Sequence, residues 1–279
     1  MPMKKKIITF VLGAYLVVFS VLAVAPIVIM LFDSFKTGSE LAVNSWGFPR
    51  DFTFYNYTSL VSYNSGIMIR TFMNSVFVST VCTLLALLLS CLAAYAFAKF
   101  QFKGKNAIFA LLLATMMIPT ELTMPAVYLM FSKVKMLNTY SIQIFPGIAN
   151  VFCLFMLRQT IETIPSSLLE AAKLDGASHM GIFWRLVVPL SKPSLGALAI
   201  LTFLNKWNDY IWPHTMLTKQ EIMPIMVILP TLNVSSSVWA IPWELILTGC
   251  VVITLPLIIV FLMFQEEFMS SVTIGAVKE

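Results

Sequence analysis

The sequence predicts an all-α integral membrane protein with six transmembrane helices. Of its 279 residues, 59% are hydrophobic and only 11% are charged, and the mean hydropathy is +0.88. A soluble domain carries roughly 25% charged residues, so this composition indicates a chain that lies largely in lipid. Six stretches are apolar over the roughly 20 residues that a helix needs to cross the hydrocarbon core. Isolated strands would leave their backbone groups unpaired there, which favours helices.

The six expected spans follow one another along the chain and predict a single transmembrane domain over residues 1–279. Their approximate limits are 8–32, 72–98, 107–132, 138–159, 194–216 and 243–265. The first span resembles a secretory signal, because the lysines at 4–6 precede an apolar run. A signal core is only about 7–15 residues long, whereas this run continues through Phe32. An uncleaved span is therefore expected.

The positions of Lys and Arg predict that both termini lie in the cytoplasm. An even number of spans places the termini on one side, and cytoplasmic loops are enriched in Lys and Arg. With a cytoplasmic N-terminus, eleven of the 18 Lys and Arg residues fall inside, including the clusters at 4–6 and 99–105. Segment 160–193 then becomes a cytoplasmic loop, and segments 33–71 and 217–242 become external loops.

The cytoplasmic segment 160–193 contains a polar island, EAAKLDGASHMGIFWRLVVP, in an otherwise apolar chain. A helix should begin near Pro165, because a first turn tolerates proline. Gly176 is placed to end that helix in a left-handed conformation. A second short helix over 177–188 should stop before Pro189, which disfavours helix in the residue ahead of it. The segment is expected to be an elbow of two short helices.

The first helix of this elbow carries both small apolar and charged side chains. Leu168, Ala171 and Ala172 are expected close to one face, and the charged rim consists of Glu170, Lys173 and Asp175. An amphipathic elbow of this kind fits a groove on another protein. It would equally serve as a connector lying on the membrane surface. The residues alone leave both interpretations open.

The third expected span contains an acidic residue, Glu121, between Pro119 and Pro125. The prolines should kink or break this span and free carbonyl groups to line a cavity. Glu121 could face a pore or pair with a neighbouring helix, and the sequence does not choose between these positions.

The fifth expected span holds an unusual group of polar and aromatic side chains. They are Asn205, Lys206, Trp207, Asn208, Asp209, Tyr210 and Trp212. Ionisable residues inside a membrane are candidates for a functional site. Lys206 and Asp209 are three residues apart, so on a helix they would share a face and partly neutralise each other. The group could bind a polyhydroxyl solute along a translocation path. It could instead be an interhelical polar clasp with interfacial aromatic anchors.

The sequence carries no recognisable catalytic or cofactor-binding motif. It has no Gly-x-x-x-x-Gly-Lys-Ser/Thr run with which to bind ATP phosphates. The two histidines, His179 and His214, are far apart, and the four cysteines fall inside apolar runs without metal-ligand spacing. We expect no enzyme activity, no metal site and no nucleic-acid binding. Any ATP hydrolysis must come from a partner.

The polar island resembles the EAA signature of permease subunits of ABC importers. That signature is Glu-Ala-Ala, three residues, Gly, nine residues, then Ile-x-Leu-Pro. Here Glu170 begins the run and Gly176 and Pro189 keep the spacing, with Leu186 in place of Ile and Val188 in place of Leu. Further features resemble the maltose-type, sugar-importing branch and its smaller six-span subunit. They are Asn74-Ser75, Ala94-Tyr95-Ala96, Pro119, Trp207-Asn208 and the tail GAVKE.

The resemblance implies that the elbow is a coupling helix docked into a cleft on a cytoplasmic ATPase. Glu170 would face the ATPase, Ala171 and Ala172 would allow close approach, and Gly176 would permit the bend. The implied partners are two ABC ATPase subunits that bind ATP and magnesium, a second related permease and an extracytoplasmic substrate-binding protein. The implied substrate is a carbohydrate, and the implied location is the cytoplasmic membrane of a bacterium or archaeon.

Two other function classes make different predictions. A secondary transporter could use Lys206 and Asp209 as an ion relay, and its uptake would collapse with an uncoupler but survive depletion of ATP. A membrane-embedded enzyme using Glu121 and Asp209 would release a chemical product from the purified protein.

Overall fold

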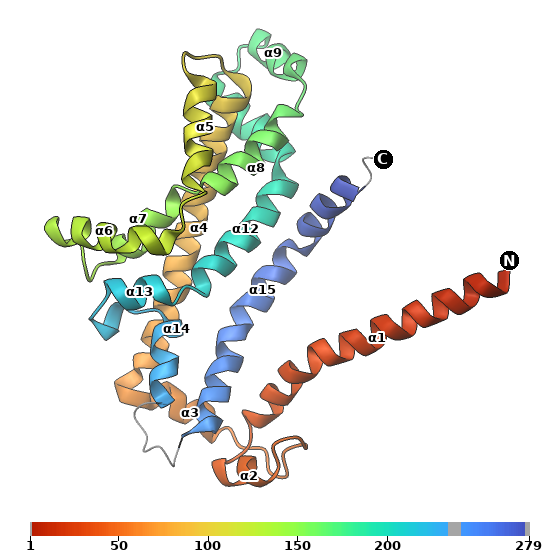
Figure 1. The fold of residues 1–279 in the computed structure, drawn as a ribbon, viewed down its shortest axis with the longest axis vertical. Helices are drawn as coiled ribbons and strands as arrows, with labels where there is room; N and C mark the ends of the chain where they lie inside the picture. Colours follow the sequence, from red (N-terminus) through yellow and green to blue (C-terminus); the bar gives the residue numbers. More distant parts are fainter. Residues whose placement is uncertain (1, 234–240, 277–279) are drawn as a thin grey trace. The chain divides into compact units, whose positions relative to one another are not determined.

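The computed structural model describes residues 2–233 and 241–276, and these residues form helices and connecting segments without strands. The predicted all-α class is therefore confirmed. The last three residues of the tail GAVKE, and residues 234–240 of the expected loop 217–242, lie outside the described residues. The helical elements (Figure 1) are α1 (Pro2–Asp33), α2 (Gly38–Val43), α3 (Tyr55–Ser62), η1 (Tyr63–Gly66), α4 (Ile67–Lys99), α5 (Lys105–Thr115), α6 (Thr120–Lys133), α7 (Tyr140–Ile148), α8 (Val151–Glu162), α9 (Ser166–Leu174), α10 (His179–Ile182), η2 (Phe183–Val187), α11 (Val188–Leu190), α12 (Lys192–Trp207), α13 (Ile211–Met216), η3 (Gln220–Ile222), α14 (Ile225–Ile228), η4 (Leu229–Asn233) and α15 (Trp243–Ala276).

Four helical stretches in the described part of the chain are long and apolar enough to cross a membrane without a sharp bend. They are Ile8–Asp33, Tyr55–Lys99, Tyr140–Glu162 and Trp243–Glu266. Two further pairs of helices pass the same test together but are bent, α5 with α6 by 98° and His179–Leu190 with α12 by 77°. By length and composition, the described residues thus provide four candidate spans, or up to six if each bent pair counts as one.

The third and fifth expected spans are broken helices. The third breaks just before Pro119, which precedes the first turn of α6, while Pro125 lies within α6. The limits 194–216 expected for the fifth span were wrong, because α12 begins at Lys192 and ends at Trp207. Its continuation, α13, is a separate helix.

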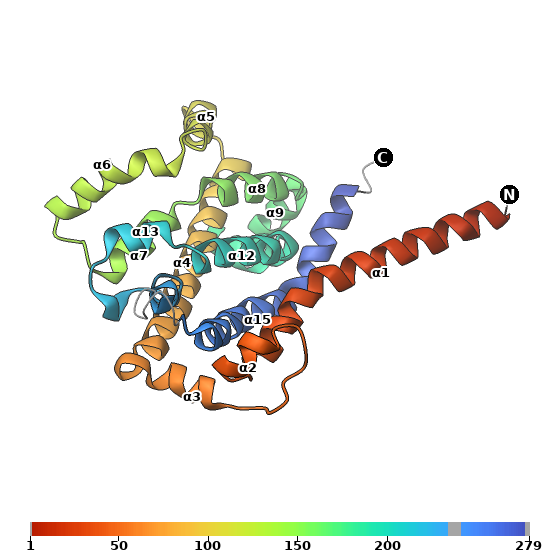
Figure 2. The same ribbon diagram turned by 60° about the horizontal axis from the view of Figure 1, so that its bottom comes forward.

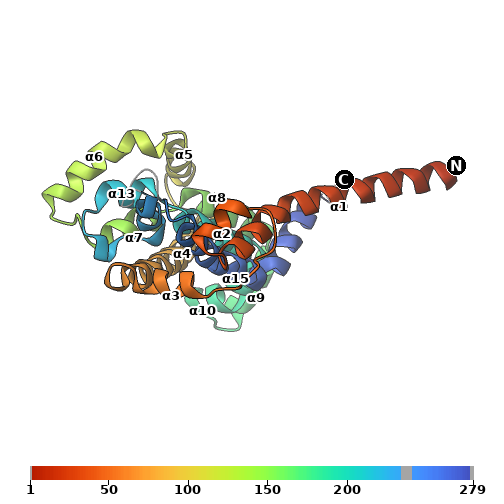
Figure 3. The same cartoon turned by 90° about the horizontal axis from the view of Figure 1, so that it is seen from below.

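The chain divides into two compact units. Unit 1 comprises Met1–Ile69 and Ile228–Leu255, and unit 2 comprises Arg70–Val227 and Pro256–Glu279. In unit 1 the apolar window of α1 has none of its residues buried, as suits a helix that faces lipid. Its Asp33 end adjoins α2 (Figure 3). There the Ser34 carbonyl accepts a hydrogen bond of 3.3 Å from the Thr248 hydroxyl of α15.

Unit 2 is built around α4, with α8 and α12 packed together beside it (Figure 2). Small residues allow this close packing, since Ala86 and Ala94 of α4 are fully buried. A β-carbon added at Gly147 of α7 would lie only 2.5 Å from the sulfur of Cys82, so a larger residue there would force this part of α7 or the Cys82 side chain to shift. The elbow helix α9 lies at the end of the bundle where α4 ends (Figure 1).

Candidate functional site

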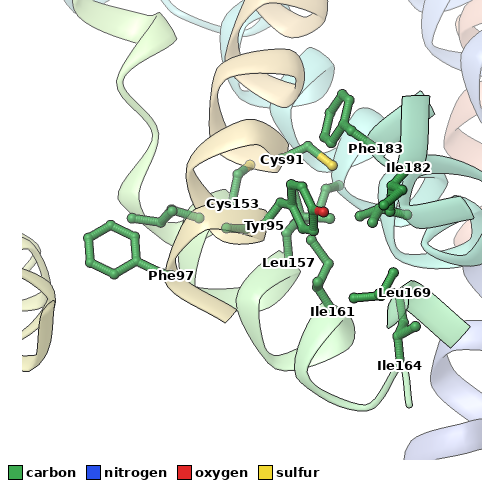
Figure 4. Packing of buried hydrophobic residues seen from close by; sticks show 14 residues of the cluster. Cys91, Tyr95, Phe97, Cys153, Leu157, Ile161, Ile164, Leu169, Ile182 and Phe183 are labelled. Carbon is green, nitrogen blue, oxygen red and sulfur yellow. The ribbon is translucent and has the colours of Figure 1, made fainter. Parts of the chain in front are cut away.

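The polar elbow rests on an apolar cluster within unit 2 (Figure 4). Buried members come from four parts of the chain: Cys91, Ala94, Tyr95 and Phe97 of α4; Cys153, Leu154, Leu157 and Ile161 of α8; Ile164 and Leu169 at α9; and Ile182, Phe183, Val187 and Leu198 from α10 to α12. Burying one Leu or Phe side chain contributes about 1.5–3 kcal/mol. The cluster therefore fastens both helices of the elbow to the spanning helices.

Polar contacts fix the corner where α8 turns into α9. The ammonium group of Lys99, at the end of α4, donates to the carbonyl oxygens of Glu162 at 3.3 Å and Ile164 at 2.5 Å. A cation at the C-terminus of a helix satisfies carbonyls that have no partner within the helix and complements the helix dipole. The start of α9 is thus tied directly to α4.

The bend of the elbow has the geometry expected for glycine. Gly176 has a φ of +81°, in the left-handed region that other residues rarely adopt. Its N–H donates to the carbonyl of Lys173 at 3.0 Å, and the N–H of Ala177 donates to that of Ala172 at 2.9 Å. This pair of bonds is a Schellman motif, which closes a helix and reverses the chain. The predicted bend at Gly176 is confirmed.

The faces of α9 differ from the expectation. Leu169 is the buried residue, with 6% of its surface exposed, whereas Leu168 is 48% exposed. Ala172 packs against the cluster and Ala171 is exposed, so Leu168 and Ala171 face outward. The physical reason is that the cluster lies beneath Leu169, one residue further round the helix.

The outward face of α9 combines charged and apolar side chains. Glu170, Lys173 and Asp175 are all exposed, and Leu174 is 90% exposed. A hollow between α9 and the end of α4 is lined by Tyr95, Lys99, Phe100, Ser166, Leu169, Glu170, Lys173 and His179. This face of α9 is therefore not covered by the described part of the chain.

The second helix of the elbow does not stop before Pro189, so that prediction was wrong. After α10 the chain forms a π-helical turn, η2, and then α11, which contains Pro189. In this wide turn the N–H of Val188 donates to the carbonyl of Phe183, five residues back. A wide turn accommodates a proline ring that would clash with the carbonyl four residues before it. The bend comes later, at Ser191.

Asp209 bridges the gap between α12 and α13, which breaks the expected fifth span after Trp207. One carboxylate oxygen accepts from the ammonium of Lys206 at 2.8 Å, and the other accepts from the backbone N–H of Trp212 at 3.3 Å. The predicted ion pair exists, but Asp209 does not share a helix with Lys206, because α12 ends at Trp207. Asp209 thus joins the end of α12 to the start of α13.

The other candidates in the fifth span separate into exposed and buried side chains. Asn205, Asn208 and Tyr210 are exposed. Trp207 is fully buried, with its ring stacked on that of Phe203 at 5.6 Å between ring centroids. Its indole N–H has no hydrogen-bond partner among the described residues. Trp207 is therefore part of the packing of unit 2.

Glu121 is exposed in the first turn of α6. It lines an open hollow with Met124, Pro125, Tyr128, Leu129 and Thr215. Since Thr215 belongs to α13, this hollow brings the acidic residue of the third span beside the continuation of the fifth.

Four polar residues that the sequence did not link together hold segment 218–225 against the bundle. The amide of Asn74 donates to the carbonyls of Glu221 at 2.8 Å and Met223 at 3.1 Å, and its oxygen accepts from Tyr140 at 2.8 Å. Three further side chains bind the backbone of the same segment. They are Ser75, which accepts from Ile225; Gln143, which donates to Ile222; and Asn138, which accepts from Thr218 and Lys219. The sequence signal that points to these four residues is their polarity within otherwise apolar stretches.

We expect Asn74→Ala to release segment 218–225. The change removes two hydrogen bonds to buried or partly buried carbonyls, at a cost of about 1–3 kcal/mol, which makes local opening roughly 5- to 150-fold more frequent. Lys219 is exposed in this segment, and cleavage of an opened state follows its population. Faster tryptic cleavage after Lys219 in lipid nanodiscs is the expected result. Asn106→Ala, at an exposed position in α5, is the matched control, and equal rates in the two variants would contradict the role of Asn74.

Comparisons with known proteins agree with this architecture. Residues 86–272 match the family of binding-protein-dependent transport system inner membrane components. The arabinooligosaccharides transport system permease protein AraQ of Bacillus subtilis is 35% identical, covering 96% of this chain and 95% of that protein. The lactose transport system permease protein LacG of Rhizobium radiobacter is 31% identical over 74% of each.

Among solved structures, a chain of a bacterial ABC transporter involved in the import of the acidic polysaccharide alginate has the same fold. The TM-score is 0.82 at 23% identity, covering 95% of this chain and 98% of that one. The family match covers most of the chain, and the AraQ match covers nearly all of it. The chain belongs to the family of binding-protein-dependent transport system inner membrane components.

Proposed function

We propose that this chain is a permease subunit of an ATP-driven ABC importer for a sugar or oligosaccharide. The observation that carries the proposal is the elbow. One face of α9 packs into the chain's own core through Leu169, while the other exposes Glu170, Lys173 and Leu174. A helix fixed on one side and exposed on the other can transmit a push from a partner. The names of the permeases that resemble this chain support a carbohydrate substrate.

The proposed mechanism assigns ATP and magnesium to two partner ATPase subunits that hold the elbow. When the ATPases close on ATP, the elbow moves with them, and Leu169 and Phe183 carry this motion through the apolar cluster to α4, α8 and α12. The transmembrane pathway then alternates its access between the two sides. An extracytoplasmic binding protein delivers the carbohydrate, and a second, related permease completes the pathway.

The proposed solute path follows the break in the fifth span. Exposed amide and hydroxyl groups of Asn205, Asn208 and Tyr210 offer hydrogen bonds to a polyhydroxyl solute. Asp209 holds the break in shape through its two bonds, and Glu121 lines the neighbouring hollow. This path lies in the cytoplasmic membrane of a bacterium or archaeon, with both termini of the chain cytoplasmic.

Purification of the tagged protein from its native membrane in mild detergent tests the assembly. We expect mass spectrometry to identify an ATPase with a P-loop and a second permease in the purified complex. Recovery of the folded chain alone in several detergents would contradict the proposal.

The paired Lys206 and Asp209 keep one alternative open, a secondary transporter driven by an ion gradient. The two mechanisms differ in their energy source. Uptake that stops with an uncoupler but continues without ATP would establish the alternative, whereas uptake that follows ATP supports the importer.

Gly176→Pro should abolish uptake. Proline is fixed near a φ of −65° and cannot adopt +81°, and it lacks the N–H that bonds to the carbonyl of Lys173. A β-carbon at this site meets no atom of the described residues within 4 Å, and asparagine tolerates the left-handed region better than other residues, so Gly176→Asn is the matched control. Uptake and membrane content are measured for both variants. Normal uptake by the proline variant would show that the bend is dispensable.

A further inference from the structure

Five large aromatic side chains in unit 1 are strongly exposed between α1 and the first turn of α3. We call them the aromatic shelf: Trp46 (86% exposed), Phe48 (74%), Phe52 (61%), Phe54 (68%) and Tyr55 (73%). Each aromatic side chain of this kind can bury about 150–250 Å². Leaving all five in water would be unfavourable, which indicates that something covers them.

The shelf is held on a rigid polar frame. Lys36 is fully buried, and its ammonium group donates at 2.6 Å both to Asp33 and to the carbonyl of Asn44. The amide of Asn56 donates to the carbonyls of Ser34 at 2.9 Å and Lys36 at 2.7 Å. Much of the polarity of this loop is therefore satisfied internally.

Glu40 extends the same frame. Its carboxylate accepts from the backbone N–H of Arg50 at 2.7 Å and from the amide of Asn44 at 3.2 Å. The bond from the backbone N–H of Arg50 lowers the pKa of Glu40. The ring of Phe35 packs against two shelf rings, with centroid distances of 5.8 Å to Phe52 and 5.3 Å to Phe54. The shelf is thus a preformed surface.

The position of the shelf along α1 identifies what covers it. The ring of Phe48 packs edge-to-face on that of Phe32 at 4.8 Å, and Phe32 lies in the last turn of α1. The 26 residues of the apolar span Ile8–Asp33 extend about 39 Å, more than the roughly 30 Å hydrocarbon core. The last turn of α1 therefore lies at the level of the lipid headgroups. The shelf continues the exposed apolar surface of that helix.

We propose that the aromatic shelf inserts into the headgroup region of the bilayer at the Asp33 end of α1. Trp and Tyr are enriched at this depth because their rings are apolar while the indole N–H and the phenol remain hydrated, and Trp46 and Tyr55 supply these groups. The three Phe rings add apolar surface that lipid can cover. The shelf fixes the depth of α1 in the membrane. This role depends on membrane embedding and is independent of the transported solute.

Tryptophan quenching in lipid nanodiscs tests the proposal on the full chain within its purified complex. The emission of Trp46 is obtained as the difference between the wild-type protein and Trp46→Phe. Phosphatidylcholine brominated near the headgroup end of its acyl chains should remove most of this emission. Deeply placed bromines and aqueous iodide should remove little. Trp207→Phe gives the matched difference for a fully buried tryptophan, which should resist both kinds of quencher.

Two results would overturn the proposal. One is a Trp46 emission that iodide quenches and brominated lipid leaves unchanged, which would place the shelf in water. The other is protection from iodide only after addition of the purified substrate-binding protein, which would make the shelf a protein-docking surface. Neither result bears on whether the complex hydrolyses ATP, so the proposed transport function is tested separately.

Discussion

Charge reversal at Glu170 is expected to abolish uptake by the assembled importer while leaving the chain folded in the membrane. Glu170 is exposed on α9, so the fold does not depend on burying it. In the proposed complex its carboxylate faces a groove of the ATPase. Glu170→Arg would place a positive guanidinium against a groove that suits a negative carboxylate. This mismatch should cost about 2–5 kcal/mol of docking free energy. Docking would weaken roughly 30-fold to several-thousand-fold.

Uptake, membrane content and recovery of the ATPase are measured together for Glu170→Arg. The matched control is Glu266→Arg, the same reversal at an exposed position of α15, which should transport normally. Normal uptake by Glu170→Arg would exclude the elbow as the docking site. Lost uptake with full recovery of the ATPase would show that Glu170 acts after docking.

Much of the fold was predictable because its signals are local. Apolar length alone indicates the spanning helices, and Pro119 and Gly176 impose restrictions on φ, ψ and hydrogen bonding that act within a few residues. A prediction from such a residue fails where the neighbouring backbone changes its hydrogen bonding to accommodate it. Pro189 was expected to end a helix, but the π-helical turn η2 accommodates its ring.

The candidate site was less predictable, because its details depend on tertiary contacts. The end of α12 at Trp207 allows Asp209 to bond both Lys206 and the start of α13, which spacing alone does not indicate. In the sequence, Asn74 and Ser75 stand out only through the family resemblance. Their bonds to Met223 and Ile225 join residues about 150 positions apart in the chain. No local pattern encodes such a pairing.

The two leucines at the start of α9 allow the anchoring of the elbow to be tested separately from its docking. Leu169→Ala should destabilise the elbow by about 2–5 kcal/mol, because it leaves a cavity in the apolar cluster. Leu168→Ala, one residue earlier on the exposed face, should change stability by less than about 0.5 kcal/mol. Tryptic cleavage after the exposed Lys173 reports local release of α9, and it should accelerate only in Leu169→Ala.

The functional consequence follows from the same geometry. If the elbow transmits motion through Leu169, then Leu169→Ala should retain the ATPase and its hydrolysis of ATP but lose most uptake, because the push no longer reaches α4 and α8. Leu168→Ala alters only the outward face of α9. Any loss of uptake in this variant should therefore come with reduced recovery of the ATPase. Equal cleavage and equal uptake in the two variants would mean that the cluster does not couple the elbow to the membrane helices. A parallel loss of hydrolysis and uptake in Leu169→Ala would instead show that the cluster is needed for docking itself.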